Sequence, residues 1–173
     1  MQLYVDSLKQ IASPQIRPHD FGNHIGSIKS PEKFAIDIND MGEKRKQWIY
    51  ADSIDKYGST EDIIKLAKLH ESNSVKLVAF CILLKRDADM AINILVDDIN
   101  NPNIVLCGNG DEWLEESISS IRTRIAQTGK EKYKISDKDS IKIDSAVLQS
   151  KNRIKNLYYV FNLKKRQHFI RPE

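Results

Sequence analysis

The longest apolar run in the sequence, residues 77–84 (LVAFCILL), most constrains how this chain can fold. A segment that is apolar on every side must be covered on every side, because it has no polar face to present to water. The run is far shorter than the ~20 residues that a membrane-spanning helix needs, so it belongs to a protein core. Its length and its content of strand-forming residues predict a buried strand over 75–85.

Alternating apolar residues predict further strands around this one. Phe34, Ile36 and Ile38 would share one face of an extended chain, and the aromatic segment that follows predicts a strand pairing back on them as a hairpin. The sequence RDAD at 86–89 predicts a turn into another alternating segment, which would complete a second hairpin. The predicted strands are therefore 34–38, 47–51, 75–85, 90–96, 103–107, 156–163 and, more weakly, 141–148.

Three segments instead repeat apolar residues at helical spacing. The first dozen residues carry such a stripe, which stops before the prolines of a long loop at 13–32. Ser59 and Asp62 resemble a capping box, which predicts a helix over 60–71. The third stripe follows the sequence GNGDEW and predicts a helix that ends near Gly129. The residues of the first and third stripes are Tyr4, Leu8 and Ile11, and Leu114, Ile118, Ile121 and Ile125.

These segments predict an α+β fold in a single domain of 173 residues. Short turns between successive strands favour a mainly antiparallel sheet of about five to seven strands. We expect two amphipathic helices to pack on one face of the sheet, beside a short N-terminal helix. Residues 1–129 would form the compact body, including the loop at 13–32, and residues 130–173 a basic, aromatic C-terminal arm. Whether this arm adds one or two strands to the sheet stays open.

Charge divides the chain into two parts of opposite sign. Residues 1–123 hold 14 Lys and Arg against 19 Asp and Glu, a net charge of −5, whereas residues 124–173 hold 13 against 5, a net charge of +8. Basic arms commonly bind polyanions such as nucleic acid, or membrane surfaces and acidic proteins. The alternatives are that the charge serves solubility, or that the arm docks on the acidic body of the same chain.

The arm interleaves cations with aromatic residues, a combination suited to single-stranded nucleic acid. Cations neutralise phosphates, and aromatic rings stack on unpaired bases. The alternative is a final strand whose aromatic residues lie in the core while the flanking lysines face water. The residues expected to bind nucleic acid or another anion are Lys151, Arg153, Lys155, Tyr158, Lys164, Lys165, Arg166 and Arg171.

A second hypothesis is a metal-dependent hydrolase of phosphodiesters. His19 and His24 in the long loop are metal-ligand types, and Asp97 at the end of a predicted strand would complete the site. The spacing H-x-x-x-x-H is not a specific signature, so a plain surface loop is the alternative. The turn at GNGDEW does not predict a phosphate site, because the carboxylates of Asp111 and Glu112 would repel a phosphate there.

Sequence motifs favour a binding module over an enzyme. The chain contains no phosphate-loop, nucleophile-elbow or zinc-protease pattern, and no motif requires a cofactor. Cys81 and Cys107 lie in apolar segments and are expected to be core thiols. Without a signal-peptide pattern at the start, we expect a cytoplasmic protein. A third hypothesis is an assembly domain, in which an exposed sheet edge recruits a second copy or another protein chain.

Overall fold

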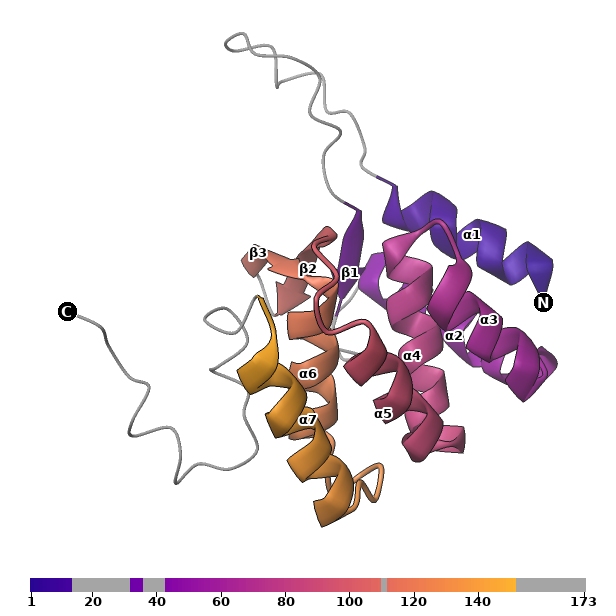
Figure 1. Ribbon diagram of the computed structural model, residues 1–173. Helices are drawn as coiled ribbons and strands as arrows, with labels where there is room; N and C mark the ends of the chain where they lie inside the picture. Colours follow the sequence, from indigo (N-terminus) through magenta and orange to yellow (C-terminus); the bar gives the residue numbers. More distant parts are fainter. Residues whose placement is uncertain (14–31, 36–42, 110–111, 152–173) are drawn as a thin grey trace, which may run out of the picture.

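The computed structural model describes residues 1–13, 32–35, 43–109 and 112–151 of the chain. These residues form a bundle of helices with a small sheet at one side (Figure 1). In chain order the elements are α1 (Gln2–Ala12), β1 (Lys33–Ala35), α2 (Glu43–Tyr57), α3 (Thr60–Leu69), α4 (Asn73–Arg86), α5 (Ala88–Asp97), β2 (Ile104–Asn109), β3 (Glu112–Ser117), α6 (Ile118–Thr128) and α7 (Asp137–Gln149).

The described fold is dominated by helices, so the predicted α+β fold with a large antiparallel sheet is wrong. The described residues contain one three-stranded sheet with the order β1-β2-β3. Strand β1 runs parallel to β2, with Lys33 opposite Leu106. Strands β2 and β3 form an antiparallel pair in which Asn109 lies opposite Glu112. Most of the core is therefore made by helices packing on helices.

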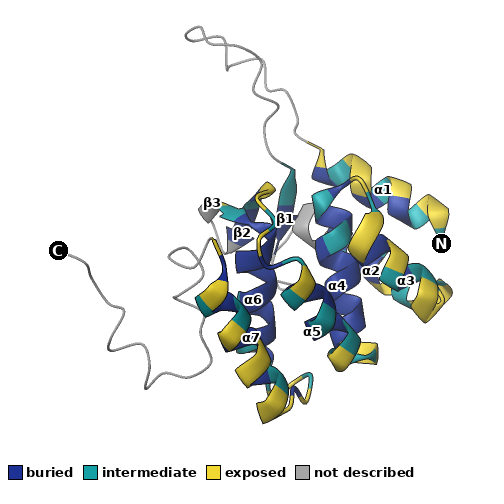
Figure 2. Ribbon diagram, viewed as in Figure 1, coloured by how far each residue is buried: buried dark blue, intermediate teal, exposed yellow. Residues whose placement is uncertain are grey.

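Helix α4 contains the long apolar run and forms the centre of the core. Ser74, Val75 and all of residues 77–84 are buried (Figure 2). The helix contacts α1, α2, α3, α5 and α6 as well as β1 and β2. The burial predicted for this run is confirmed, but the strand predicted over 75–85 is wrong.

Polar residues at the two ends of α4 explain why this run is helical. The Ser72 hydroxyl accepts the Val75 N–H at 3.3 Å and caps the first turn. Lys85 and Arg86 lie in the last turn, where cations suit the negative end of the helix dipole. These ends bracket a helix of 14 residues, longer than most strands. A continuous apolar run alone does not distinguish a buried strand from a buried helix.

The strands predicted at the start of α2 and along α5 are also wrong. In α2, the buried residues Gln47, Ala51 and Ile54 follow helical spacing. In α5, the Asp87 carboxylate accepts the Met90 N–H at 2.9 Å and caps the start of the helix. The aromatic residues at 48–50 and the alternating residues at 90–96 favour strands locally. Both segments nevertheless pack on α4 as helices.

The segment after β2 departs from the prediction in its first half. The helix predicted after GNGDEW begins only at Ile118, because residues 112–117 pair with β2 as strand β3. The end predicted near Gly129 is confirmed, since Gly129 is the C-terminal cap of α6. The sequence Asn109-Gly110 is a common hairpin signal, which fits a strand after this turn better than a helix.

The weak strand predicted over 141–148 is wrong, because these residues belong to helix α7. The Ser136 hydroxyl caps this helix by accepting the Asp139 N–H at 3.1 Å. Helix α7 lies beside α5 and buries Ile143 and Val147. The strand predicted over 156–163 lies outside the described residues.

Three predicted elements are confirmed: the N-terminal helix, the capped helix α3 and the strand β2. The strand predicted over 34–38 is confirmed at Phe34 and Ala35, which belong to β1, while residues 36–38 lie outside the described residues. Helix α1 buries Val5 and Leu8. Helix α3 has the expected cap, in which the Ser59 hydroxyl accepts the Asp62 N–H at 3.1 Å. The loop predicted at 13–32 lies outside the described residues except at its two ends. The capping signals at Ser59 and Gly129 are therefore confirmed.

A side chain from α2 closes the outer edge of β1. Gln47 is 4% exposed, and its amide oxygen accepts the Ala35 N–H at 3.1 Å. The same amide group donates to the Ala35 carbonyl at 3.0 Å. These two bonds take the place of a neighbouring strand. Another chain could pair with β1 at Ala35 only by displacing Gln47.

Changing Gln47 to alanine should destabilise the protein by about 2–4 kcal/mol, because two buried backbone groups of Ala35 lose their partner. Urea denaturation followed by circular dichroism measures this change in the free energy of unfolding. Ser53→Ala in the same helix is the control, since the Ser53 hydroxyl bonds only to the Ile49 carbonyl one turn earlier. A Q47A variant as stable as S53A would contradict the role assigned to Gln47.

Candidate functional site

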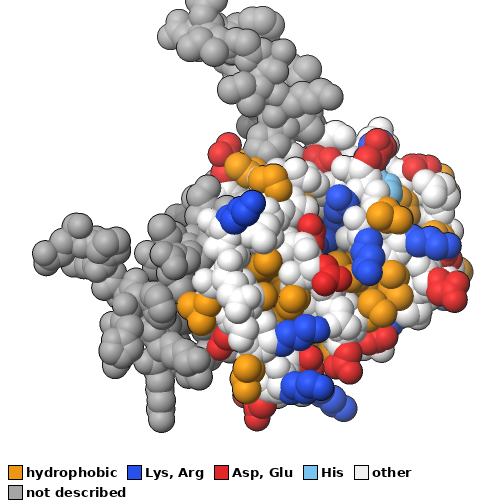
Figure 3. Space-filling model, in the orientation of Figure 1, with side chains coloured by type: hydrophobic (Ala, Val, Ile, Leu, Met, Phe, Trp, Pro, Cys, Tyr) orange, Lys and Arg blue, Asp and Glu red, His pale blue; other side chains and the backbone are white. Residues whose placement is uncertain are grey.

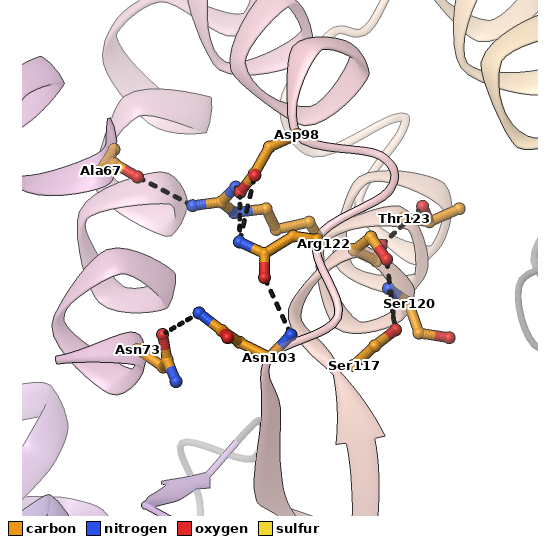
Figure 4. Close-up of polar contacts among 10 residues, drawn as sticks. Ala67, Asn73, Asp98, Asn103, Ser117, Ser120, Arg122 and Thr123 are labelled. Carbon is orange, nitrogen blue, oxygen red and sulfur yellow. Dashed lines mark hydrogen bonds and ion pairs between the residues drawn. The ribbon is translucent and has the colours of Figure 1, made fainter. Parts of the chain in front are cut away.

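A buried arginine, Arg122, joins three helices to α6 (Figure 4). Its side chain has no exposed surface. The Nη1 atom donates to the Asp98 carboxylate at 2.6 Å, and Nη2 donates to the Ala67 carbonyl at 2.8 Å. The guanidinium carbon lies 5.4 Å from the centre of the Phe80 ring, within cation–π range. Arg122 thus ties α6 to the end of α3, the middle of α4 and the cap of α5.

The Arg122 charge depends on Asp98 for compensation. Burial lowers the pKa of the Arg122 guanidinium, and the Asp98 carboxylate opposes that shift. Among the described residues, the Nε atom of Arg122 has no hydrogen-bond partner. An arginine stays charged at neutral pH, so removing Asp98 would leave an unpaired charge in the core. The Asp98 side chain is 36% exposed, so this ion pair reaches from the core to the surface.

The Asp98 carboxylate also organises the 98–103 loop, which connects α5 to β2. Asn101 donates to both carboxylate oxygens of Asp98 at 3.0 Å, and its own amide oxygen accepts the Asn103 N–H at 2.9 Å. The Asn103 side chain donates in turn to Asn73 at 3.2 Å, at the start of α4 (Figure 4). A chain of polar contacts therefore runs from the buried arginine along the loop to α4.

The same loop holds residues on two further elements. The Asn103 carbonyl accepts the Ile118 N–H at 3.0 Å, at the start of α6. The Asn100 side-chain oxygen accepts the Lys151 N–H at 2.7 Å, just beyond the end of α7. The 98–103 loop is thus bonded to α4, to α6 and to Lys151, the residue that precedes the cations of residues 152–173.

A second polar cluster lies between β2, β3 and α6. Arg124 donates to the Glu116 carboxylate at 2.7 Å and to the Cys107 sulfur at 3.1 Å. Burial raises the pKa of Glu116, and the charge of Arg124 opposes that shift. Burial also raises the pKa of the Cys107 thiol to about 12, which keeps the sulfur protonated. A protonated thiol is a poor nucleophile, so this cluster has the chemistry of a structural contact.

The structure places few of the residues that the sequence predicts for a site. Lys151 follows α7, whereas the other cations and Tyr158 of the predicted binding set lie outside the described residues. His19 and His24 of the metal hypothesis also lie outside them, and Asp97 is exposed at the last position of α5. Within the described ranges, no group of three or more His, Cys, Asp or Glu side chains is arranged to hold a metal ion.

The sequence contains one signal for the ion pair of Arg122 with Asp98, which the prediction of the helix from its apolar residues left out. Ile118, Arg122 and Ile125 follow the spacing i, i+4 and i+7, which places the arginine on the apolar face of α6. A charged residue on an apolar face is rarely buried without a partner of opposite charge. This spacing predicts a buried ion pair, but it does not identify Asp98 as the partner.

Comparison with protein-family models, with curated protein sequences and with solved structures finds no match to this chain. No helix in the described part of the chain has both the length and the apolar character needed to cross a bilayer.

Changing Asp98 to alanine should destabilise the protein by about 3 kcal/mol, because the Arg122 charge stays buried without its partner. Arg122→Met should be less damaging, since methionine fills much of the same volume, the part-exposed Asp98 can turn to water, and only the Ala67 carbonyl loses a buried partner. Asp97→Ala is the control, because it removes the exposed carboxylate of the preceding residue. It should change the free energy of unfolding by less than about 0.5 kcal/mol. Denaturation showing R122M to be as damaging as D98A would contradict this account of the pair.

Both cysteines should be unreactive in the folded protein. Cys81 and Cys107 are buried, and burial raises the pKa of each thiol to about 12. Because only the thiolate reacts, labelling with a disulfide reagent at about pH 8 should be slow, and any native-state rate should rise about tenfold per pH unit. In concentrated denaturant both thiols should react at once. Rapid labelling of either cysteine in native buffer would contradict this prediction.

Proposed function

We propose that this protein is a non-catalytic binding module whose basic arm binds single-stranded nucleic acid. The observation that carries the proposal is the change of sign along the chain, from −5 over residues 1–123 to +8 over residues 124–173. Residues 152–173 alone hold six Lys and Arg against one Glu, a net charge of +5 (6 − 1). Such a segment can neutralise several phosphates of a nucleic-acid backbone.

Aromatic residues in the arm favour a single strand over a duplex. Tyr158, Tyr159, Phe161 and Phe169 lie among the cations of residues 152–173. Aromatic rings stack on bases that are unpaired, and this stacking adds to the affinity without requiring a particular sequence. Bases inside a duplex are already stacked on their neighbours, so only the phosphate contacts would remain there.

The helical body fits the role of a scaffold in this proposal. Two of its arginines are engaged in internal ion pairs, Arg122 with Asp98 and Arg124 with Glu116. On the face drawn in Figure 3, acidic, basic and apolar side chains are interspersed over the described residues. This mixture does not favour a polyanion over any other partner on that face. The concentration of cations in the arm is therefore the stronger reason to place the ligand there.

Changing Lys164, Lys165 and Arg166 together to alanine should weaken binding and flatten its salt dependence. Loss of three cations should weaken affinity about tenfold or more, and should reduce the slope of log K against log salt concentration by about 2 on a single strand. Fluorescence anisotropy measures both quantities when single-stranded RNA, single-stranded DNA and duplex DNA are titrated at two or more salt concentrations.

A matched control changes three exposed lysines of the body, Lys46, Lys65 and Lys68, to alanine. This variant loses the same charge but keeps the arm, so it should retain most of the affinity. An equal loss in both variants would indicate that net charge alone determines binding. Unchanged affinity and slope in the arm variant would refute the assignment to that cluster, and failure of the intact chain to bind any of the three probes would refute the proposed function.

A further inference from the structure

We infer that Asn100 is a positioning residue, which fixes Lys151, the residue directly before the terminal part of the basic arm (residues 152–173). The inference rests on the proposed function, since the position of the arm matters only if the arm binds a ligand. Its basis is the hydrogen bond of 2.7 Å from the Lys151 N–H to the Asn100 side-chain oxygen. Lys151 is also the first cation of the set predicted to bind an anion.

The chain leaves the helical ladder of α7 at Ser150, one residue before this contact. Ser150 caps the helix with an extended backbone, at φ −70° and ψ 149°, and its hydroxyl donates to the Val147 carbonyl at 2.9 Å. The next backbone N–H, that of Lys151, lies beyond the hydrogen bonds of the helix and is free to bond to another part of the chain. Asn100 supplies it from 51 positions earlier in the sequence.

The loop that carries Asn100 is itself held at both ends. At one end, the Asp98 carboxylate accepts a hydrogen bond from the buried Arg122. At the other end, Asn103 bonds to the Asn73 side chain and to the backbone of Ile118. Asn100 is exposed between these fixed points. Its side chain thus adds little to the core, and a substitution there should leave the body folded.

A second contact joins α5 and α7 ahead of the terminal part of the arm, residues 152–173. The Lys142 ammonium donates to the Asn93 side chain, in the middle of α5. The two contacts follow the same order along both segments, because Lys142 meets Asn93 and the later Lys151 meets the later Asn100. Helices α5 and α7 therefore lie side by side and run in the same direction (Figure 1). This contact holds the helices together without involving the start of the arm. Asn93 therefore provides a matched control for Asn100.

A fixed starting point should strengthen binding by the arm. Binding restricts the orientations of a segment, and a segment that already starts from a defined position loses less freedom. Arg153 and Lys155 follow Lys151 within four residues, so the anchor acts most directly on these cations. Asn100 would contribute to affinity in this way without touching the ligand.

Asn100→Ala in the intact chain tests this inference by two measurements. Hydrogen–deuterium exchange of the Lys151 amide should become about three- to tenfold faster, the range expected for loss of one hydrogen bond. Affinity for the single-stranded probe, measured by anisotropy, should fall by a similar factor. The melting temperature and the salt slope should stay unchanged, because the body remains packed and no charge is removed. A purely structural role would change the exchange or the melting temperature but not the affinity.

Two further variants complete the experiment. Asn93→Ala should leave both the Lys151 exchange and the affinity unchanged, whereas Asn100→Asp keeps an acceptor oxygen and should restore slow exchange. Unchanged affinity in N100A overturns the inference, even if exchange becomes faster. If Lys151 exchange is unchanged in N100A, the anchor is refuted while the proposed function stands. If the wild-type chain binds none of the probes, the proposed function fails, and positioning by Asn100 fails with it.

Discussion

The enclosure of α4 is the constraint on which the rest of the structure depends. A helix that is apolar around its whole circumference is stable in water only when other elements cover every side. Helices α1, α2 and α3 cover one side of α4, and α5 and α6 cover the other (Figure 1). The sheet meets α4 at its start, where the Glu32 carboxylate next to β1 accepts the Ser74 N–H at 2.9 Å. Helices therefore cover most of α4, and three short strands suffice to complete the core.

Packing several helices against one central helix brings their ends together, and these ends need polar partners. The last carbonyls of a helix have no partner within it, and the Ala67 carbonyl is one of these in α3. Arg122 bonds to that carbonyl and to Asp98 at the cap of α5. One side chain thereby satisfies a backbone carbonyl at the end of α3 and pairs with the carboxylate at the cap of α5, although its own charge is desolvated. The 98–103 loop extends the same contacts outward, as far as the backbone of Lys151.

Capping residues distinguished helices from strands better than apolar content or alternation did. The pair Ser59 and Asp62 correctly predicted α3, and the same kinds of side chain, Ser72 and Asp87, flank α4. Treating these two residues as caps would have identified a 14-residue helix where the apolar run indicated a strand. The candidate site was harder to predict, because Arg122 meets partners 24 and 55 positions away in the sequence. Spacing places Arg122 on an apolar face, but only the packing of α3 and α5 around α4 determines what it contacts there.

A buried arginine orients the groups to which it bonds more than it adds to the free energy of unfolding. Its attraction to Asp98 is largely offset by the loss of hydration, so the main cost of an apolar side chain of similar size would be the Ala67 carbonyl left without its partner. An apolar side chain, however, would not determine where the 98–103 loop lies, because dispersion contacts have no preferred direction. The hydrogen bonds from Arg122 and Asn101 hold the Asp98 carboxylate, and Asn100, two residues further along the same loop, bonds to Lys151. We infer that the buried charge acts chiefly by fixing the surface loop that holds Lys151.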